Sequence, residues 1–185
     1  MQSSVVDVDV THSLPGKRSG DCMASLADAL VKKFLEGRYV AALATQDPRN
    51  HIHMVAVWYW FDGSHIFVAT SSRSRKARNL ESSPIVSLMI DSRDPLASCG
   101  ITIAGDAQVL NGPSSQKVNL EIHQKYLSEA ALADTRVGPV FAAWDDVTIQ
   151  ITPDSIIAWD MREADKHVFG SAFAAHPEYL LPIER

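Results

Sequence analysis

The sequence predicts a mainly β fold: an antiparallel barrel of six to seven strands with flanking α-helices. Runs rich in β-branched and aromatic residues recur along the chain, and most are joined by short turns. Strands and helices do not alternate regularly, as they would in a doubly wound parallel sheet. The chain contains neither an internal repeat nor a low-complexity tract.

The N-terminal part predicts a flexible arm followed by a helix. Residues 1–21 are polar and rich in turn-forming residues, so we expect them to be mobile. Asp21 stands as an N-cap before apolar residues that recur at helical spacing from Met23 to Leu35. Gly37 follows where a C-terminal cap belongs, so an amphipathic helix is expected between these caps.

Strand patterns and turn signals fill most of the remaining chain. Asp62-Gly63 is the strongest hairpin signal and joins two of the strands. A short polar helix is predicted over 72–82 and a longer helix over about 114–130, and the chain ends in a polar tail. The predicted strands are residues 38–45, 53–61, 65–70, 85–90, 100–110, 146–152 and 155–160.

Length and charge limit the classes of function. The chain has 185 residues, 46% of them hydrophobic, and we expect 22–185 to form one barrel domain with its own core. The 17 basic and 22 acidic residues give a net charge of −5. Nonspecific attraction to nucleic acid is therefore disfavoured, and we expect no nucleic-acid partner.

Compartment is predicted from the cysteines and the N-terminal residues. Cys22 and Cys99 lie far apart without CxxC spacing, which excludes a disulfide framework and fits a reducing environment. The first residues include acids where a secretory signal needs an apolar core, and no run approaches the length of a membrane span. We expect a cytoplasmic protein without membrane association.

Several common catalytic motifs are absent. The sequence contains no GxGxxG, no Walker A loop, no GxSxG elbow and no HExxH. A Rossmann dehydrogenase, a P-loop NTPase, an α/β-hydrolase and a zincin are therefore poorly supported.

The strongest functional signal lies in residues 70–78, TSSRSRKAR, where four cations and four hydroxyls follow a strand and open a helix. Free backbone N–H groups at a helix start favour an anion, and Arg75 and Lys76 add charged donors. A terminal phosphate group offers oxygens to all of these donors. Two other interpretations stay open: a solvated basic helix face, or a nucleic-acid patch, which the short cluster and the net charge disfavour.

An apolar strand precedes this segment. Its residues belong to the core on both faces, or one face contacts a partner or a flat ligand. Alternation places Val55, Val57 and Tyr59 on one face and Met54, Ala56, Trp58 and Trp60 on the other.

Three histidines are candidate metal ligands. His51 and His53 share one strand face and His65 begins the next strand. No carboxylate lies at matching spacing, so we expect no metal site.

The order of strand, Asp-Gly hairpin, returning strand, SRKA at 74–77 and NL at 79–80 resembles the flavin-binding split barrels related to pyridoxamine 5′-phosphate oxidase. Residues 54–90 carry the resemblance. Two later strands, 100–110 and 151–160, extend it, so that it spans roughly residues 38–160.

The resemblance implies a split barrel that binds FMN in a groove at a homodimer interface. It places one strand along the flavin ring and ribityl chain, a strand end and a basic segment at the phosphate, and a tryptophan from the other subunit near the ring. The implied cofactor-binding residues are Met54, Val55, Ala56, Val57, Ala69, Thr70, Ser71, Ser74, Arg75, Lys76 and Trp159.

The chain departs from the true oxidases at their substrate contacts. Met54 and Tyr59 stand where those enzymes carry an arginine and a lysine, and only His167 remains of a later Arg-x-His element. We therefore expect a small-molecule substrate other than pyridoxamine phosphate. Tyr59 and His167 are candidate proton donors near the ring, each better explained as structural.

The leading hypothesis is an FMN-dependent oxidoreductase that transfers hydride between the flavin and an unidentified small molecule. One alternative is a deazaflavin-dependent reductase of the same fold. Another is a non-catalytic protein that binds flavin or haem.

Overall fold

A computed structural model describes residues 22–92, 94 and 98–181. The predicted flexible arm, 1–21, lies outside the described residues. The strands are β1 (Cys22–Met23), β2 (Ala41–Gln46), β3 (Ile52–Val57), β4 (Trp60–Phe61), β5 (Ile66–Thr70), β6 (Ile85–Asp91), β7 (Cys99–Leu110) and β8 (Val147–Asp160). The helices are α1 (Ala29–Glu36), α2 (Arg75–Leu80), α3 (Gly112–Tyr126), α4 (Glu129–Ala133), α5 (Gly138–Trp144), α6 (Met161–Val168) and α7 (Ala172–Ala175), with a 3-10 turn at Pro177–Tyr179.

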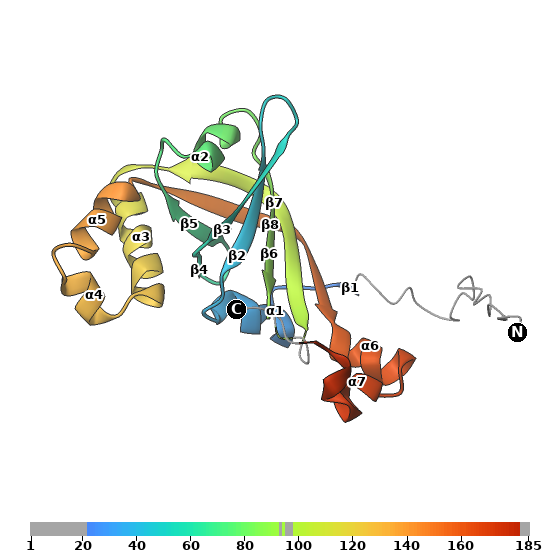
Figure 1. Ribbon diagram of the computed structural model, residues 1–185. Coiled ribbons are helices and arrows are strands. Elements are labelled where there is room, and N and C mark those ends of the chain that lie inside the picture. Colours follow the sequence, from blue (N-terminus) through green and yellow to red (C-terminus); the bar gives the residue numbers. More distant parts are fainter. Residues whose placement is uncertain (1–21, 93, 95–97, 182–185) are drawn as a thin grey trace, which may run out of the picture.

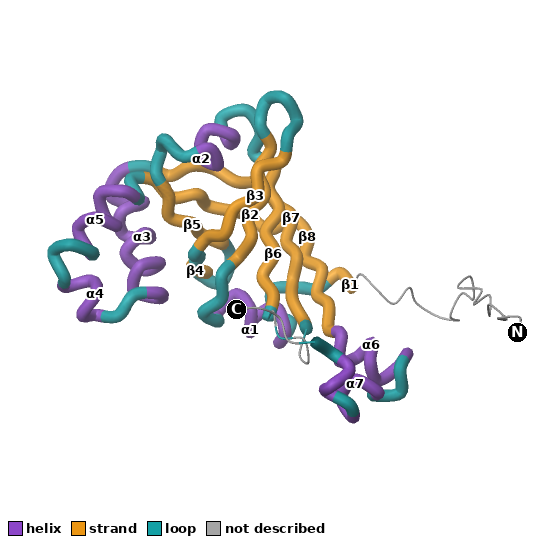
Figure 2. The backbone as a smooth tube through the Cα atoms, viewed as in Figure 1, coloured by secondary structure: helices purple, strands orange, loops and turns teal. Residues whose placement is uncertain are grey.

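All eight strands join one antiparallel sheet in the order β3-β2-β6-β7-β8-β5-β4, with β1 paired to β8. The sheet curls into a half-barrel (Figure 1), which confirms the mainly β, antiparallel split-barrel prediction. Figure 2 shows the helices gathered at its ends: α3, α4 and α5 beside the start of β8, and α6 and α7 beyond its end.

The core fills the concave side of the sheet. Side chains alternate along the strands, so that Leu43 of β2 and Leu88 of β6 are fully buried while their sequence neighbours are not. Three residues of α1, Val31, Phe34 and Leu35, complete the same cluster. One face of the sheet is thereby buried within the chain.

The first helix begins later than predicted. It starts at Ala29, after Asp28, whereas Cys22 and Met23 pair with Ala158 and Ile157 of β8. Backbone pairing to an existing sheet outweighed the helical spacing that begins at Met23. Gly37 is the C-cap as predicted.

The last two predicted strands form a single strand, β8. A register shift opposite Ala104 and Gly105 leaves Asp154 without a partner in β7 and lets the ladder continue past Pro153. A Cβ on Gly105 would overlap the Thr152 carbonyl, so this close approach requires glycine. The proline therefore interrupts pairing locally without ending the strand.

The later helices also differ from the prediction. The helix expected over 114–130 ends at Tyr126, and Ser128 caps a separate helix, α4, by accepting from the Ala131 N–H. Helix α5 has no counterpart among the predicted elements, and α6 and α7 form within the predicted polar tail. None of the described helices is long and apolar enough to cross a membrane.

We predict that Tyr59→Phe destabilises the fold. The buried Tyr59 hydroxyl donates to the carbonyls of Phe34 and Gly37, which lack helical partners at the end of α1. Leaving these carbonyls unpaired costs about 1–3 kcal/mol in the free energy of unfolding, measured in urea. The control is Tyr179→Phe on an exposed ring, which should change it little; equal losses in both variants would contradict the prediction.

Candidate functional site

The segment between β5 and α2 is a tight, self-bonded turn. The Ser74 hydroxyl accepts from the Ala77 N–H at 3.2 Å and from the Thr70 hydroxyl at 3.1 Å. Ser74 is thus the N-cap of α2. Both hydroxyls therefore form hydrogen bonds within the turn, and these bonds fix where β5 ends. We call residues 70–78 the basic segment.

This turn forms one wall of an open pocket of about 550 Å³. The opposite wall is the end of α5 and the two residues that follow it. The lining residues are Thr70, Ser71, Arg73, Ser74, Lys76, Ala143, Trp144, Asp145 and Asp146. Two cations and two carboxylates therefore face the same space.

Asp146 ties the two walls together. Its carboxylate accepts from both the backbone N–H and the hydroxyl of Ser72, each at 2.6 Å. These two hydrogen bonds hold the pKa of Asp146 below its usual value. One of the hydroxyls expected at the anion site is therefore already satisfied by a protein carboxylate.

Lys76 is one of the two cations that line the pocket. Partial burial lowers the pKa of its ammonium, and Asp145 opposes that shift. Asp145 is in turn 2.8 Å from the Nε2 of His123, a buried residue of α3. Asp145, which the sequence did not link to the site, thus acts on the Lys76 ammonium, and His123 contacts Asp145.

Arg75 turns away from this pocket. Its guanidinium donates to Asp47, in the turn between β2 and β3, at 3.1 Å and stays half exposed. Backbone hydrogen bonds, first from His51 and then from Arg49, together with Arg75, lower the pKa of Asp47 to about 2. The structure therefore brings Lys76 together with Ser71 and Ser74, but holds Arg75 at a neighbouring position on Asp47.

The basic segment lies beside the first residues of β3. Asn79 of α2 donates to the Thr45 hydroxyl at 2.9 Å, and Thr45 pairs with His53. Met54, the next residue, is therefore close to the α2 end of the sheet. Ala69, another predicted contact, pairs with Thr148 in the interior of the sheet.

The strand that was predicted to contact a flat ligand exposes one face. Met54 is 65% exposed, whereas Val57 is buried and Val55 packs against the core. Ala56 is also exposed. The strand is therefore not buried on both faces within a single chain, which was the first of its two interpretations.

The exposed side of the sheet is uncharged over several strands. Ala42 of β2 lies between Ala56 and Met89, and Ala44 lies between Met54 and Ser87. Small residues on the central strand make this face flat. We call the face formed by Ala42, Ala44, Met54, Ala56, Ser87 and Met89 the outer face.

Of the two tryptophans of the hairpin, only Trp58 lies next to the outer face, where it lines a shallow pocket with Ala56. β3 ends at Val57, and Trp58 stacks on Tyr126 with ring centroids 5.0 Å apart and on Phe141 at 5.6 Å. Trp60 packs on Phe67 instead. Continuous alternation would have kept both tryptophans on the face of Met54 and Ala56; because β3 ends at Val57, only Trp58 stays near Ala56.

Neither candidate proton donor lies near the basic segment. Burial raises the pKa of Tyr59, whose hydroxyl is bonded inside the core. His167 lies on α6, 3.3 Å from Glu163. Trp159 is near the same end of β8, beside Gly100, whereas Thr70 pairs with Val147 at the other end.

Two of the three histidines lie beside carboxylates, whereas the Nδ1 of His53 is buried and has no hydrogen-bond partner among the described residues. His51 lies 3.4 Å from Asp47, and His65 lies 3.4 Å from Asp62. Among the residues that the structure describes, no group of three or more histidine, cysteine or acidic side chains is placed to hold a metal ion.

A buried polar ladder on α3 was not predicted. Ser115, Asn119 and His123 face the start of β8, and Thr148 donates to the Asn119 side chain at 2.5 Å. The ladder fixes Asp145 beside Lys76. Its sequence signal was the i, i+4, i+8 spacing of three polar residues beside an apolar stripe.

Asp47 should make stability depend on acid pH. Its carboxylate has a lowered pKa in the folded chain, so the stabilisation is complete above about pH 4 and is lost as the pH falls toward 2. We predict that Asp47→Asn flattens the decline of the unfolding free energy between these pH values, measured by urea titration. Arg75→Gln keeps both backbone donors and should retain most of the decline; an unchanged slope in Asp47→Asn would contradict this assignment.

Comparison with known proteins identifies the family. The model of the pyridoxamine 5′-phosphate oxidase family matches residues 27–159. No curated protein matches the sequence.

Solved structures share the fold at low sequence identity. A conserved hypothetical protein from Mycobacterium tuberculosis has 23% identity and a TM-score of 0.63, covering 80% of this chain and 92% of its own. An F420 reductase has 20% identity and a TM-score of 0.53, over 68% and 94%. The haem storage protein of Vibrio cholerae has 20% identity and a TM-score of 0.55, over 69% and 92%. The chain belongs to the pyridoxamine 5′-phosphate oxidase family.

Proposed function

We propose that this chain is a flavin-dependent oxidoreductase that binds FMN between two copies of itself. The observation that carries the proposal is the position of the basic segment, with Lys76 and Arg75, beside an exposed and uncharged sheet face that begins at Met54. A flavin mononucleotide combines an anionic phosphate with a flat apolar ring. The two surfaces match its two ends.

The phosphate would lie at the basic segment. Lys76 and the Ser71 hydroxyl face the pocket, and Arg75 is half exposed next to it. Charged hydrogen bonds from Lys and Arg are the strongest contacts that a phosphate makes with side chains. The carboxylates of Asp145 and Asp146 line the same pocket and repel a phosphate. The phosphate must therefore reach Lys76 without breaking the hydrogen bonds between Ser72 and Asp146 that join the two pocket walls.

The residues at two positions that contact the substrate in the true oxidases support a substrate other than pyridoxamine phosphate. Met54 offers a thioether instead of a guanidinium, and the Tyr59 hydroxyl is enclosed in the core. Neither side chain can bind the phosphate of pyridoxamine phosphate. We infer a small-molecule substrate without that phosphate.

A homodimer supplies the groove. Thr70 and Trp159 are joined through β8, and from Val147 to Trp159 the strand runs about 40 Å at roughly 3.3 Å per residue. That is too far for one flavin mononucleotide to contact both. If both residues contact the cofactor, as the family resemblance implies, the tryptophan must come from the second copy.

The outer face suits that second copy. Its rows of small and apolar residues expose surface that one chain leaves uncovered. Two such faces in contact would enclose a ring between them and exclude water.

The flavin, when bound, accepts or donates a hydride at its ring. The chain's own residues bind the phosphate, present the strand Met54–Val57 to the ring and leave the substrate side to residues of the partner copy. We assign no side chain as acid or base.

Deazaflavin and haem are the competing ligands, since structural relatives include an F420 reductase and a haem storage protein. The outward residues of β3 are Ile52, Met54 and Ala56, so this strand offers no imidazole on the outer face to bind haem iron. Flavin therefore ranks above haem. We place the protein in the cytoplasm because its two widely spaced cysteines fit a reducing compartment.

The Arg75→Gln/Lys76→Gln variant should bind FMN at least 100-fold more weakly than the unaltered protein. Each charged hydrogen bond contributes about 1.5–3 kcal/mol, so the loss of two should exceed this factor. Quenching of flavin fluorescence in a titration measures the affinity. The same titration with a deazaflavin, and a haem titration read in the Soret band, identify the preferred cofactor.

The matched control is Lys32→Gln/Lys117→Gln, which removes the same charge from exposed positions of α1 and α3. It should leave the affinity for FMN unchanged. Equal affinity in both double variants would show that the basic segment does not bind the phosphate, and absence of binding by the unaltered protein would refute a flavin-dependent function.

A further inference from the structure

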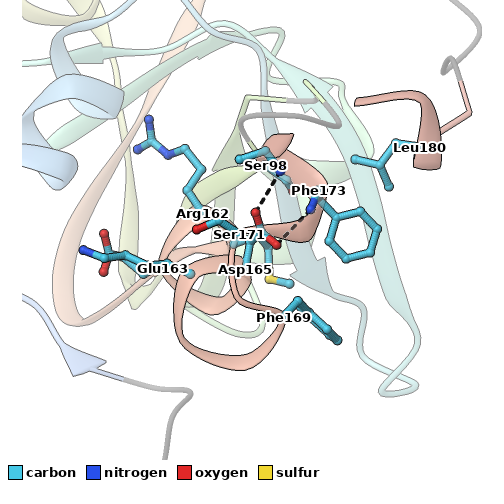
Figure 3. A pocket seen from close by; sticks show the side chains of 11 residues that line it. Ser98, Arg162, Glu163, Asp165, Phe169, Ser171, Phe173 and Leu180 are labelled. Atoms are coloured by element: carbon cyan, nitrogen blue, oxygen red, sulfur yellow. Dashed lines mark hydrogen bonds between the residues drawn. The ribbon is translucent and has the colours of Figure 1, made fainter. Parts of the chain in front are cut away.

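A second pocket, which we call the α6–α7 pocket, lies beyond the end of β8 (Figure 3). It has a volume of about 730 Å³, within the usual range for small-molecule sites. Its walls come from α6, α7 and the residues around them, together with Ser98. The apolar lining residues are Met161, Phe169, Phe173, Ala174 and Leu180.

The pocket is built on a fixed pair of helices. Asp165 of α6 is buried, and its carboxylate accepts from the backbone N–H groups of Phe173 at 3.1 Å and Ala174 at 3.0 Å, shown as dashed lines in Figure 3. The Met161 N–H donates to the Ser98 carbonyl at 2.8 Å and ties α6 to the barrel. Hydrogen bonds within the chain therefore set the walls of the pocket.

The apolar wall contains an aromatic pair. Phe169 and Phe173 meet edge to face with ring centroids 5.4 Å apart. Phe169 and Met161 remain about half exposed, so the pocket keeps apolar surface in contact with water. Covering that surface with an apolar ligand, and above all with an aromatic one, is favourable.

The charged residues that line the pocket balance one another. Two of them, Arg162 and Lys166, are cations, and two, Glu163 and Asp165, are carboxylates. Arg162 also forms an ion pair with Asp160, and Lys166 is exposed, so its ammonium stays in water. A charged ligand would lose hydration in this pocket without gaining an uncompensated opposite charge. The lining therefore favours a neutral molecule.

The pocket begins directly beside Trp159. A single residue separates Trp159 from Met161 along the chain. On the neighbouring strand, a single residue separates Ser98 from Gly100, the residue that pairs with Trp159. The indole lies against Gly100, since a Cβ on that glycine would come within 2.7 Å of the indole Cζ2 atom. A molecule that contacts Trp159 is therefore close to the α6–α7 pocket.

We propose that the α6–α7 pocket of one copy binds the substrate for the flavin held by the other copy, and that this substrate is a neutral, mainly apolar molecule. The inference rests on the proposed function, in which Trp159 of one copy lies beside the flavin that the basic segment of the other copy binds. In that dimer the pocket adjoins the flavin ring. The apolar walls and the balanced charges then indicate the class of substrate.

Three probes that share a naphthalene ring test the preference for a neutral molecule: naphthylmethanol, naphthoate and naphthylmethylammonium. At neutral pH the first is uncharged, the second is an anion and the third is a cation. In calorimetric titrations of the full-length protein loaded with FMN, naphthylmethanol should bind about tenfold more tightly than either charged probe, because burial of an unpaired charge is costly. Its binding should also change the visible absorption spectrum of the flavin, since the pocket adjoins the ring.

Ala174→Trp should abolish the binding of naphthylmethanol and the spectral change, because the larger side chain fills the pocket from an exposed position. The substitution keeps the backbone N–H that Asp165 accepts, and the variant should retain FMN. Ala175→Trp is the matched control, since it lies on the same helix, is also exposed and does not line the pocket. It should bind the probe like the unaltered protein, and light scattering checks that both variants keep the same oligomeric state.

The outcomes separate a failure of this inference from a failure of the proposed function. A protein that binds no FMN would refute the proposed function, and the assignment of its substrate with it. If FMN binds, this inference alone is overturned by a charged probe that binds as tightly as naphthylmethanol, by an unchanged flavin spectrum, or by tight binding to Ala174→Trp. Absence of probe binding would overturn it too, as would dissociation of the dimer by naphthylmethanol, because the partner copy would then cover the pocket.

Discussion

The unbroken strand β8 holds the sheet together and sets the distance between its two ends. This strand pairs with β5 near Val147, with β7 along its length and with β1 near its end. It stays continuous because the register shift at Gly105 absorbs one residue beside Pro153. A break at that proline would have allowed the last six residues to fold back; continuity instead holds Trp159 far from Thr70.

This separation decides how a site can be assembled. The basic segment and the α3–α5 helices lie at one end of β8, and α6 and α7 lie beyond the other (Figure 1). The uncharged outer face crosses the sheet between them. A ligand that needs the cations of one end and Trp159 of the other requires two copies, so the proposed dimer rests on the strand length together with the arrangement that the family resemblance implies.

Local patterns predicted much of the fold and part of the site. The Asp62-Gly63 hairpin, the cap at Gly37 and the strand–turn–helix order around Ser74 are short-range features, and each agrees with the structure. Contacts between distant segments could not be predicted from local patterns. They are the pairing of residues 22–23 with β8, the hydrogen bond from Arg75 to Asp47, and the hydrogen bonds from Ser72 to Asp146. These depend on segments brought together only by the sheet.

A mixed dimer tests the two-copy site most directly. One copy carries Arg75→Gln/Lys76→Gln, the other carries Trp159→Ala, and the two are co-expressed with different tags so that the mixed dimer can be purified. One site of this dimer then combines an intact basic segment with an intact tryptophan from the opposite copy. We expect the mixed dimer to bind one FMN with the affinity of the unaltered protein, while both parent dimers bind weakly. A mixed dimer that binds no better than its parents would show that the site does not span two copies.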